Sequence, residues 1–257
     1  MDYQRIIAQN EMAWNMRVDN GVCWTVPVSP EEIEKARRGI FQITLTATKY
    51  VPREWFPQEM KGLKILCLAC GGGQQAPILA ATGAEVTVLD MSGNQLKQDE
   101  YVANRDHLNL ITVHGNMCDL SQFDDGSFEM IYCPVSVTYI PDVMPVFKES
   151  YRVLRKKGSF LFGATNPFVY LFNGKKWDQG ILEVTNKLPF YSLDELDEED
   201  MADFLRNKNA IEFSHTLESL IGGQTKTGFL ITDFYEDMDE DLICQYSAKY
   251  FASRAIK

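Results

Sequence analysis

One stretch decides the fold of this chain: ILCLACGGGQQAPILAATGAEVTVLD, residues 65–90. An apolar strand is followed by a glycine turn, a helix and a second apolar strand, which ends at the carboxylate of Asp90. Glycines let the backbone come close to a ligand because no Cβ stands in the way. A carboxylate about 20 residues after such a turn is placed to accept the hydroxyls of a ribose. The order of these parts therefore predicts a pocket for a nucleoside.

The pattern around this stretch predicts an α/β fold with a mostly parallel sheet. Nearly continuous apolar runs, separated by helical segments, are typical of parallel strands that are covered on both faces. Strands are expected at 64–68, 85–89, 110–113, 128–133 and 159–164, and helices at 75–81, 93–106 and from Asp142 to a stop at 156–158. Residues 214–227 are expected to form the last helix. The closely spaced strands 229–235 and 250–256 are expected to pair antiparallel.

Two segments lie outside this rhythm and are expected to cover the sheet. Residues 1–50 are interpreted as an N-terminal helical lid and residues 166–213 as a cap insertion, while 51–165 and 214–257 form the core. The aromatic side chains in or near these segments are candidates for an acceptor pocket. They are Trp14, Trp24, Tyr50, Tyr139, Phe168, Tyr170 and Trp177. The sequence leaves open the alternative that these rings only pack the lid against the core.

Composition limits the classes of partner. The 257 residues are 45% hydrophobic and 24% charged, as in an ordinary globular protein, and the net charge of −11 gives no basic footprint for nucleic acid. No apolar run approaches the roughly 18 residues that cross a bilayer, and no signal peptide is evident, so a cytoplasmic protein is expected. Cys67 and Cys70 form a lone C-x-x-C without a second pair, so we expect reduced thiols and no metal site.

The glycine turn alone leaves two ligands open. Residues 71–76, GGGQQA, satisfy the G-x-G-x-x-G/A pattern of dinucleotide binding, and Asp90 suits the ribose of NAD. S-adenosylmethionine shares the adenosine but brings a methionine tail to the turn instead of a diphosphate. The glycines by themselves do not separate an oxidoreductase from a methyltransferase.

Five blocks in order resemble the class I S-adenosylmethionine-dependent methyltransferases. The resemblance is to the bacterial small-molecule type that is similar to the ubiquinone and menaquinone biosynthesis methyltransferases. The blocks are LCLACGGG at 66–73, DMS at 90–92, GNM at 115–117, DGSFE at 125–129, and YIPD with YRVLRKKG between 139 and 158. The resemblance implies a three-layer α/β/α, Rossmann-like fold with seven strands, the last one antiparallel. It also implies methyl transfer from S-adenosylmethionine to a small-molecule acceptor.

The resemblance further implies a set of cofactor-binding residues. The backbone of the turn contacts the methionine part, Asp90 takes the ribose hydroxyls, Met91 packs on adenine, and Met117 donates its N–H to the ring. The full set is Ala69, Cys70, Gly71, Gly72, Gly73, Asp90, Met91, Gln95, Asn116, Met117, Pro134 and Val135. Cys67, Ala69 and Asn116 depart from the family pattern, and these departures keep open a third hypothesis, a non-catalytic S-adenosylmethionine-binding protein.

No catalytic base stands out in the sequence. Methyl transfer needs a base only if the acceptor is protonated. Tyr139, Tyr191 and His215 are weak candidates, and each has an equally simple structural role. The acceptor, the methylated atom and the oligomeric state do not follow from the sequence.

Overall fold

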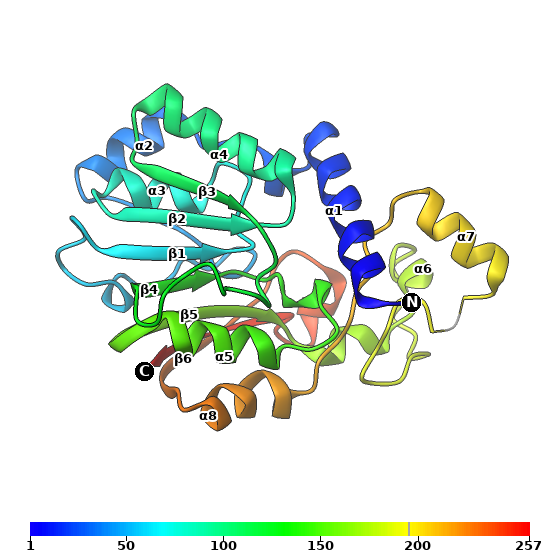
Figure 1. Ribbon diagram of the computed structural model, residues 1–257. Helices are drawn as coiled ribbons and strands as arrows, with labels where there is room; N and C mark the ends of the chain where they lie inside the picture. The colour runs from blue at the N-terminus through cyan, green and yellow to red at the C-terminus, as the bar shows by residue number, and fades with distance from the viewer. Residues whose placement is uncertain (195) are drawn as a thin grey trace.

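A seven-stranded sheet forms the centre of the computed structural model, which describes residues 1–194 and 196–257 (Figure 1). The strand order is β3-β2-β1-β4-β5-β7-β6, and only β7 runs opposite to its neighbours β5 and β6. The strands are β1 Lys64–Leu68, β2 Glu85–Asp90, β3 Leu110–His114, β4 Phe128–Cys133, β5 Leu154–Thr165, β6 Leu230–Asp237 and β7 Tyr250–Ile256. The predicted fold, including the antiparallel strand, is confirmed.

Alternation along the strands builds one apolar layer on each face of the sheet. In β1, Ile65 and Cys67 belong to one buried cluster, and Leu66 and Leu68 belong to the other. The first cluster is completed by α2 (Pro30–Arg37), α3 (Gln75–Ala81) and α4 (Gly93–Asp106), and the second by α5 (Met144–Val153) and the helical turn Glu218–Gly222 before α8 (Gly223–Thr227). Both faces of the strands are therefore apolar, which explains their continuous hydrophobic runs.

Two expected element boundaries are wrong. Helix α5 ends at Val153, and β5 begins at Leu154, where it pairs with Phe128, whereas the sequence predicted a stop at 156–158 and a strand from 159. Pairing with β4 provides hydrogen bonds that the local sequence does not reveal. The last helical segment begins near Glu218 instead of 214, because the Thr216 hydroxyl accepts the Ser219 N–H and caps it there.

Helix α1 (Tyr3–Asp19) connects the core with the residues around the cap. Figure 1 shows it between the sheet and the cap helices α6 (Gly174–Trp177) and α7 (Glu198–Arg206). Asn15 accepts hydrogen bonds from Ser92 and Asn94 at the start of α4, whereas Asn10 donates to the carbonyls of Tyr139 and Ile211 at 3.0 Å. In the described part of the chain, no helix combines the length and apolarity needed to span a bilayer.

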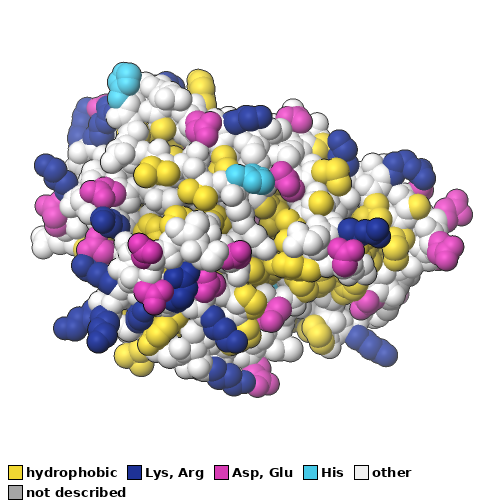
Figure 2. Space-filling view, in the orientation of Figure 1, with side chains coloured by type: hydrophobic (Ala, Val, Ile, Leu, Met, Phe, Trp, Pro, Cys, Tyr) yellow, Lys and Arg dark blue, Asp and Glu magenta, His cyan; other side chains and the backbone are white. Residues whose placement is uncertain are grey.

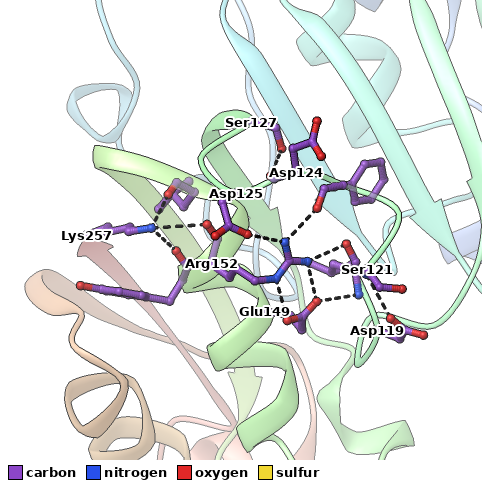
Figure 3. Close-up of polar contacts among 12 residues, drawn as sticks. Asp119, Ser121, Asp124, Asp125, Ser127, Glu149, Arg152 and Lys257 are labelled. Carbon is purple, nitrogen blue, oxygen red and sulfur yellow. Dashed lines mark hydrogen bonds and ion pairs between the residues drawn. The ribbon is translucent and has the colours of Figure 1, made fainter.

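Arg152 on α5 anchors the loop between β3 and β4 (Figure 3). Its guanidinium donates to the carboxylates of Asp125 and Glu149, each at 2.8 Å, and this cation lowers the pKa of Glu149. It also donates to the loop carbonyls of Leu120 and Phe123 at 2.8 and 2.9 Å. The loop carries Met117, so this anchor helps to position one wall of the cavity described below.

Candidate active site

A cavity of about 580 Å³ opens at the carboxyl ends of the parallel strands. This is the edge at which sheets of this kind bind ligands. One end, here called the turn end, is lined by the β1–α3 turn, the end of β2 and Met117. The other, here called the cap end, is lined by α1, the 44–47 segment, the residues after β4, the 165–170 segment, Glu212 and the start of β7. One cavity therefore spans both parts of the predicted site.

Asp90 is fixed at the turn end by two backbone donors. Its Oδ2 accepts the Gly71 N–H at 3.0 Å and its Oδ1 accepts the Ser92 N–H at 2.8 Å. A Cβ at position 71 would stand 3.0 Å from Asp90 Oδ2 and 2.7 Å from the Cβ of Gln95. Only glycine therefore fits here. Burial raises the pKa of Asp90, and the two N–H donors act against this rise.

Asp99 holds the other two glycines of the turn. Its Oδ2 accepts the Gly72 N–H at 3.1 Å and its Oδ1 accepts the Gly73 N–H at 3.2 Å, and its side chain is completely buried on α4. All three glycine N–H groups are thus occupied by oxygens of the protein. A dinucleotide fingerprint needs such groups free for the diphosphate. The turn therefore has the glycine pattern of a dinucleotide site without its free donors.

Gly72 and Gly73, which were predicted to contact the cofactor, do not line the cavity. Both have positive φ, and a Cβ at these positions would stand 2.8 Å from the carbonyl oxygens of Trp24 and Gln98, respectively. Gly72 therefore packs against Trp24 and Thr25, and Gly73 packs against α4. Gln74 extends this contact, because its Nε2 donates to the Val26 carbonyl at 2.8 Å. Residues 23–28 are thereby tied to the outer side of the turn.

Nine of the twelve predicted cofactor residues line the cavity. They are Ala69, Cys70, Gly71, Asp90, Met91, Gln95, Met117, Pro134 and Val135. Asn116 does not line it, because its Nδ2 donates to the Tyr3 hydroxyl at 2.8 Å and its Oδ1 accepts the Cys118 N–H. Gln95 Oε1 is buried and has no hydrogen-bond partner among the described residues. It is an acceptor that a bound ligand can satisfy, so the turn end fits a ligand with several donors.

Four of the seven predicted acceptor-pocket rings line the cavity. Trp14, Trp24, Tyr139 and Tyr170 do so. Tyr50 is half exposed and does not line the cavity, although its bridge partner Thr44 does. Phe168 also lies outside the lining, and Trp177 packs edge-on against Phe172. The structure therefore does not bring these three rings together with the other four.

None of the three weak base candidates is arranged as a base. The Tyr139 hydroxyl accepts from Arg17 at 3.0 Å, and burial raises the pKa of Tyr139 to about 12. Tyr191 stacks on Phe213 outside the cavity. His215 also lies outside the cavity: it is buried with its Nε2 2.9 Å from the Val137 carbonyl, and burial lowers its pKa. Tyr139 alone lines the cavity, so the other two have structural roles.

The sequence reasoning missed several residues of the site. Arg17, Glu212, Lys249 and Tyr250 line the cap end, and Asp99 supports the turn from below. The burial of Asp99 could have been predicted from the sequence, because it lies three residues from both Leu96 and Val102 on the buried face of a predicted helix. Glu212 and Lys249 could not have been predicted, because they come to the cavity from distant parts of the chain.

Comparisons with known proteins agree with this geometry. A family model described as a methyltransferase domain matches residues 66–162. The chain is 45% identical over 252 residues, 98% of each chain, to a Bacillus subtilis protein named uncharacterized methyltransferase YbaJ. It is 37% identical over 102 residues to demethylmenaquinone methyltransferase of Listeria monocytogenes, which covers 38% of this chain and 43% of that protein.

Solved structures share the fold. An S-adenosylmethionine-dependent methyltransferase from Mesorhizobium loti superposes with a TM-score of 0.61 at 20% identity, over 80% of this chain and 95% of that one. A second, from Listeria monocytogenes, gives 0.59 at 18% identity, over 80% and 94% of the two chains. The full-length relative, together with the family model, shows that the chain is a methyltransferase. The chain belongs to the class I S-adenosylmethionine-dependent methyltransferases.

Proposed function

We propose that this enzyme methylates a small molecule that binds at the cap end, with S-adenosylmethionine at the turn end of the same cavity. One observation carries the proposal: nine residues predicted to contact the cofactor line one cavity, next to a turn whose three glycine N–H groups are already occupied. A ligand at this turn must do without free glycine donors. A methionine tail meets that condition, and a diphosphate does not.

The residues of the turn end suit each part of the cofactor. Each Asp90 oxygen accepts one backbone N–H and keeps a lone pair, so the carboxylate is free to accept two ribose hydroxyls. Met91 and Met117 are buried at the same end and offer polarisable packing for adenine. Gln95 Oε1 is available to a donor of the ligand. When bound, S-adenosylmethionine supplies an activated methyl group on a sulfonium.

The protein's own contribution is then alignment and the exclusion of water. Pro134 and Val135 line the cavity just beyond β4, and the Val135 N–H donates to the Leu45 carbonyl at 3.0 Å, which fixes the wall formed by residues 44–47. Helix α1 and the 23–28 segment cover the cavity from the other side. Holding two reactants in a productive orientation supplies roughly 7–11 kcal/mol of a reaction barrier.

The charge of the protein supports a small-molecule acceptor, and its cysteine thiols support a cytoplasmic location. A net charge of −11 and the interspersed acidic and basic side chains on the face drawn in Figure 2 favour a small-molecule acceptor over a nucleic acid. All six cysteines are free thiols, which is in keeping with a reducing compartment such as the cytoplasm.

Calorimetry tests the proposal with S-adenosylmethionine, S-adenosylhomocysteine and NAD as ligands. The first two are expected to bind and NAD is not. Asp90→Ala should lose roughly 1.5–3 kcal/mol of cofactor affinity, the range for a hydrogen bond to a charged group. Asp124→Ala, which removes an exposed loop carboxylate, is the matched control and should bind like the wild type. Tighter binding of NAD would overturn the proposal, and binding without turnover across a broad acceptor panel would favour a non-catalytic protein.

A further inference from the structure

Three charged side chains line the cap end, and two of them already have partners. Lys249 Nζ donates to Asp241 at 2.6 Å and to Asp239 at 3.2 Å. Arg17 donates to the Tyr139 hydroxyl at 3.0 Å, and its guanidinium lies 4.5 Å from the centre of the Trp14 ring. Both cations are thus stabilised by the protein itself. The third charged group is Glu212.

Glu212 has a fixed backbone and a carboxylate without a partner. Its N–H donates to Ser192 Oγ at 3.0 Å, its carbonyl accepts the Ser192 N–H at 3.0 Å, and both neighbours, Ile211 and Phe213, are buried. The side chain is partly buried and lines the cavity. Within residues 1–194 and 196–257, its carboxylate has no hydrogen bond or ion pair, so its oxygens remain available to a ligand in the cavity.

The surroundings of Glu212 define the rest of the acceptor. Burial raises the pKa of Glu212, and the positive charge of Arg17 acts in the opposite direction. The rings of Trp14, Tyr139, Tyr170 and Tyr250 line the same end of the cavity. The Tyr170 hydroxyl is hydrogen-bonded to Thr138, so its ring is held in place. An unpaired acceptor oxygen among aromatic rings suits a ligand with a donor head and an apolar body.

We propose that Glu212 binds an N–H or O–H donor group of the methyl acceptor, which makes the acceptor an amine or a hydroxyl compound with an aromatic or apolar body. This inference rests on the proposed function, because it assigns the acceptor to the cavity that holds the cofactor. It also distinguishes this acceptor from a carboxylate ligand, which would bind Arg17 and be repelled by Glu212. The donor is an ammonium or a hydroxyl, and the test separates the two.

Three probes with one common ring test the inference on protein saturated with S-adenosylhomocysteine. They are benzylamine, benzyl alcohol and benzoate, and their binding is measured by NMR titration at pH 7.5. Benzylamine or benzyl alcohol is expected to bind at millimolar concentration, more tightly than benzoate. Glu212→Gln should weaken that binding about tenfold, and Glu212→Asp should restore part of it. Glu199→Gln, an exposed cap glutamate, is the matched control and should leave it unchanged.

A second readout separates recognition from a structural effect. Binding of the donor probe should weaken as the pH falls through the pKa of Glu212, because the carboxylate gains a proton and loses its charge. Tyr139 and Tyr170 at this end stay protonated there, since burial raises the pKa of both. The other charged side chains that line it are Arg17 and Lys249. The dissociation constant of S-adenosylhomocysteine should be the same in the wild type and in Glu212→Gln.

Four outcomes would overturn the inference. In the first, the wild type and Glu212→Gln bind the probes equally well. In the second, the protein prefers benzoate and loses its binding in Arg17→Gln. In the third, Glu212→Gln no longer binds S-adenosylhomocysteine, and in the fourth, the saturated wild type binds no probe at all. Failure of the wild type to bind S-adenosylhomocysteine is a different result. It contradicts the proposed function, and the assignment of Glu212 falls with it.

Discussion

Asp99 on α4 accepts the backbone N–H of Gly73 through one carboxylate oxygen and that of Gly72 through the other. The sequence motif that resembles a phosphate-binding loop is therefore bound by an acid of the protein. This relationship explains how a chain with the glycine spacing of a dinucleotide site has no donor left for a diphosphate. It also makes a buried side chain of α4 one of the groups that fix the geometry of the turn.

Removal of Asp99 should destabilise the fold. Asp99→Ala leaves the buried Gly73 N–H without an acceptor and the Gly72 N–H with only the Gln95 carbonyl, and an unsatisfied buried N–H costs about 1–3 kcal/mol. The free energy of unfolding, measured by urea denaturation, should fall by about 1–3 kcal/mol, and less in Asp99→Asn, which keeps one acceptor oxygen. Asp124→Ala should change it by less than about 0.5 kcal/mol, as expected for an exposed site. A wild-type stability for Asp99→Ala would show that the two hydrogen bonds contribute nothing.

Asp99 should also make stability depend on pH. Burial, together with the negative charge of Asp90, raises the pKa of Asp99 well above its ordinary value of 3.8. At pH values between 3.8 and the raised pKa, Asp99 holds a proton in the folded chain and releases it in the unfolded chain. The contribution of Asp99 to the free energy of unfolding therefore falls as pH rises through this window. Urea denaturation at several pH values should give a steeper decline for the wild type than for Asp99→Asn, and parallel curves would refute the assignment.

Gly163 in β5 lets the 44–47 segment lie directly against the sheet. A Cβ at position 163 would stand 2.2 Å from the Leu45 carbonyl oxygen, which is a backbone atom that cannot rotate away. Gly163→Ala should cost about 1–3 kcal/mol, as overpacking of a core does, and should weaken S-adenosylhomocysteine binding because a cavity wall moves. Gly174→Ala is the control, since nothing lies within 4 Å of its Cβ position. Equal stability and affinity for the two variants would contradict this account.

Arg152 should stabilise the fold more than an exposed basic side chain does. Arg152→Met removes hydrogen bonds to the carboxylates of Asp125 and Glu149 and to two carbonyls of the loop in Figure 3. We expect the free energy of unfolding, measured by thermal or urea denaturation, to fall by about 2 kcal/mol. Arg155→Met breaks an ion pair with Glu129 in which the Arg155 side chain is 55% exposed. That change should cost under about 1 kcal/mol. Similar losses for both variants would mean that the loop does not depend on Arg152.

The sequence predicted most of the core and part of the site. The first four strands and their helices follow a local rule, apolar runs divided by glycine turns and capping residues, so their bounds agree within a residue or two. The start of β5 depends on pairing with Phe128, which no local pattern encodes. The place of Asp90 at the cavity was predictable because it ends the strand about 20 residues after the turn, whereas its contact with ribose stays a prediction.

The cap end was the least predictable part of the site. Arg17, Glu212 and Lys249 meet there from the first helix, the end of the cap and the start of the last strand. Their approach depends on tertiary contacts, such as the hydrogen bonds of Asn10 to Tyr139 and Ile211, that join these segments. Trp177 and Phe168 lie outside the cavity, although their aromatic side chains had made them candidates for its lining.

A crystal structure of the protein with S-adenosylhomocysteine tests the central claim most directly. The account predicts the ribose hydroxyls within hydrogen-bond distance of the Asp90 carboxylate, the adenine between Met91 and Met117, and the sulfur beside Ala69 and Val135, facing the cap end. Density for the ligand away from Asp90, or a turn end that stays empty at saturating ligand, would contradict it.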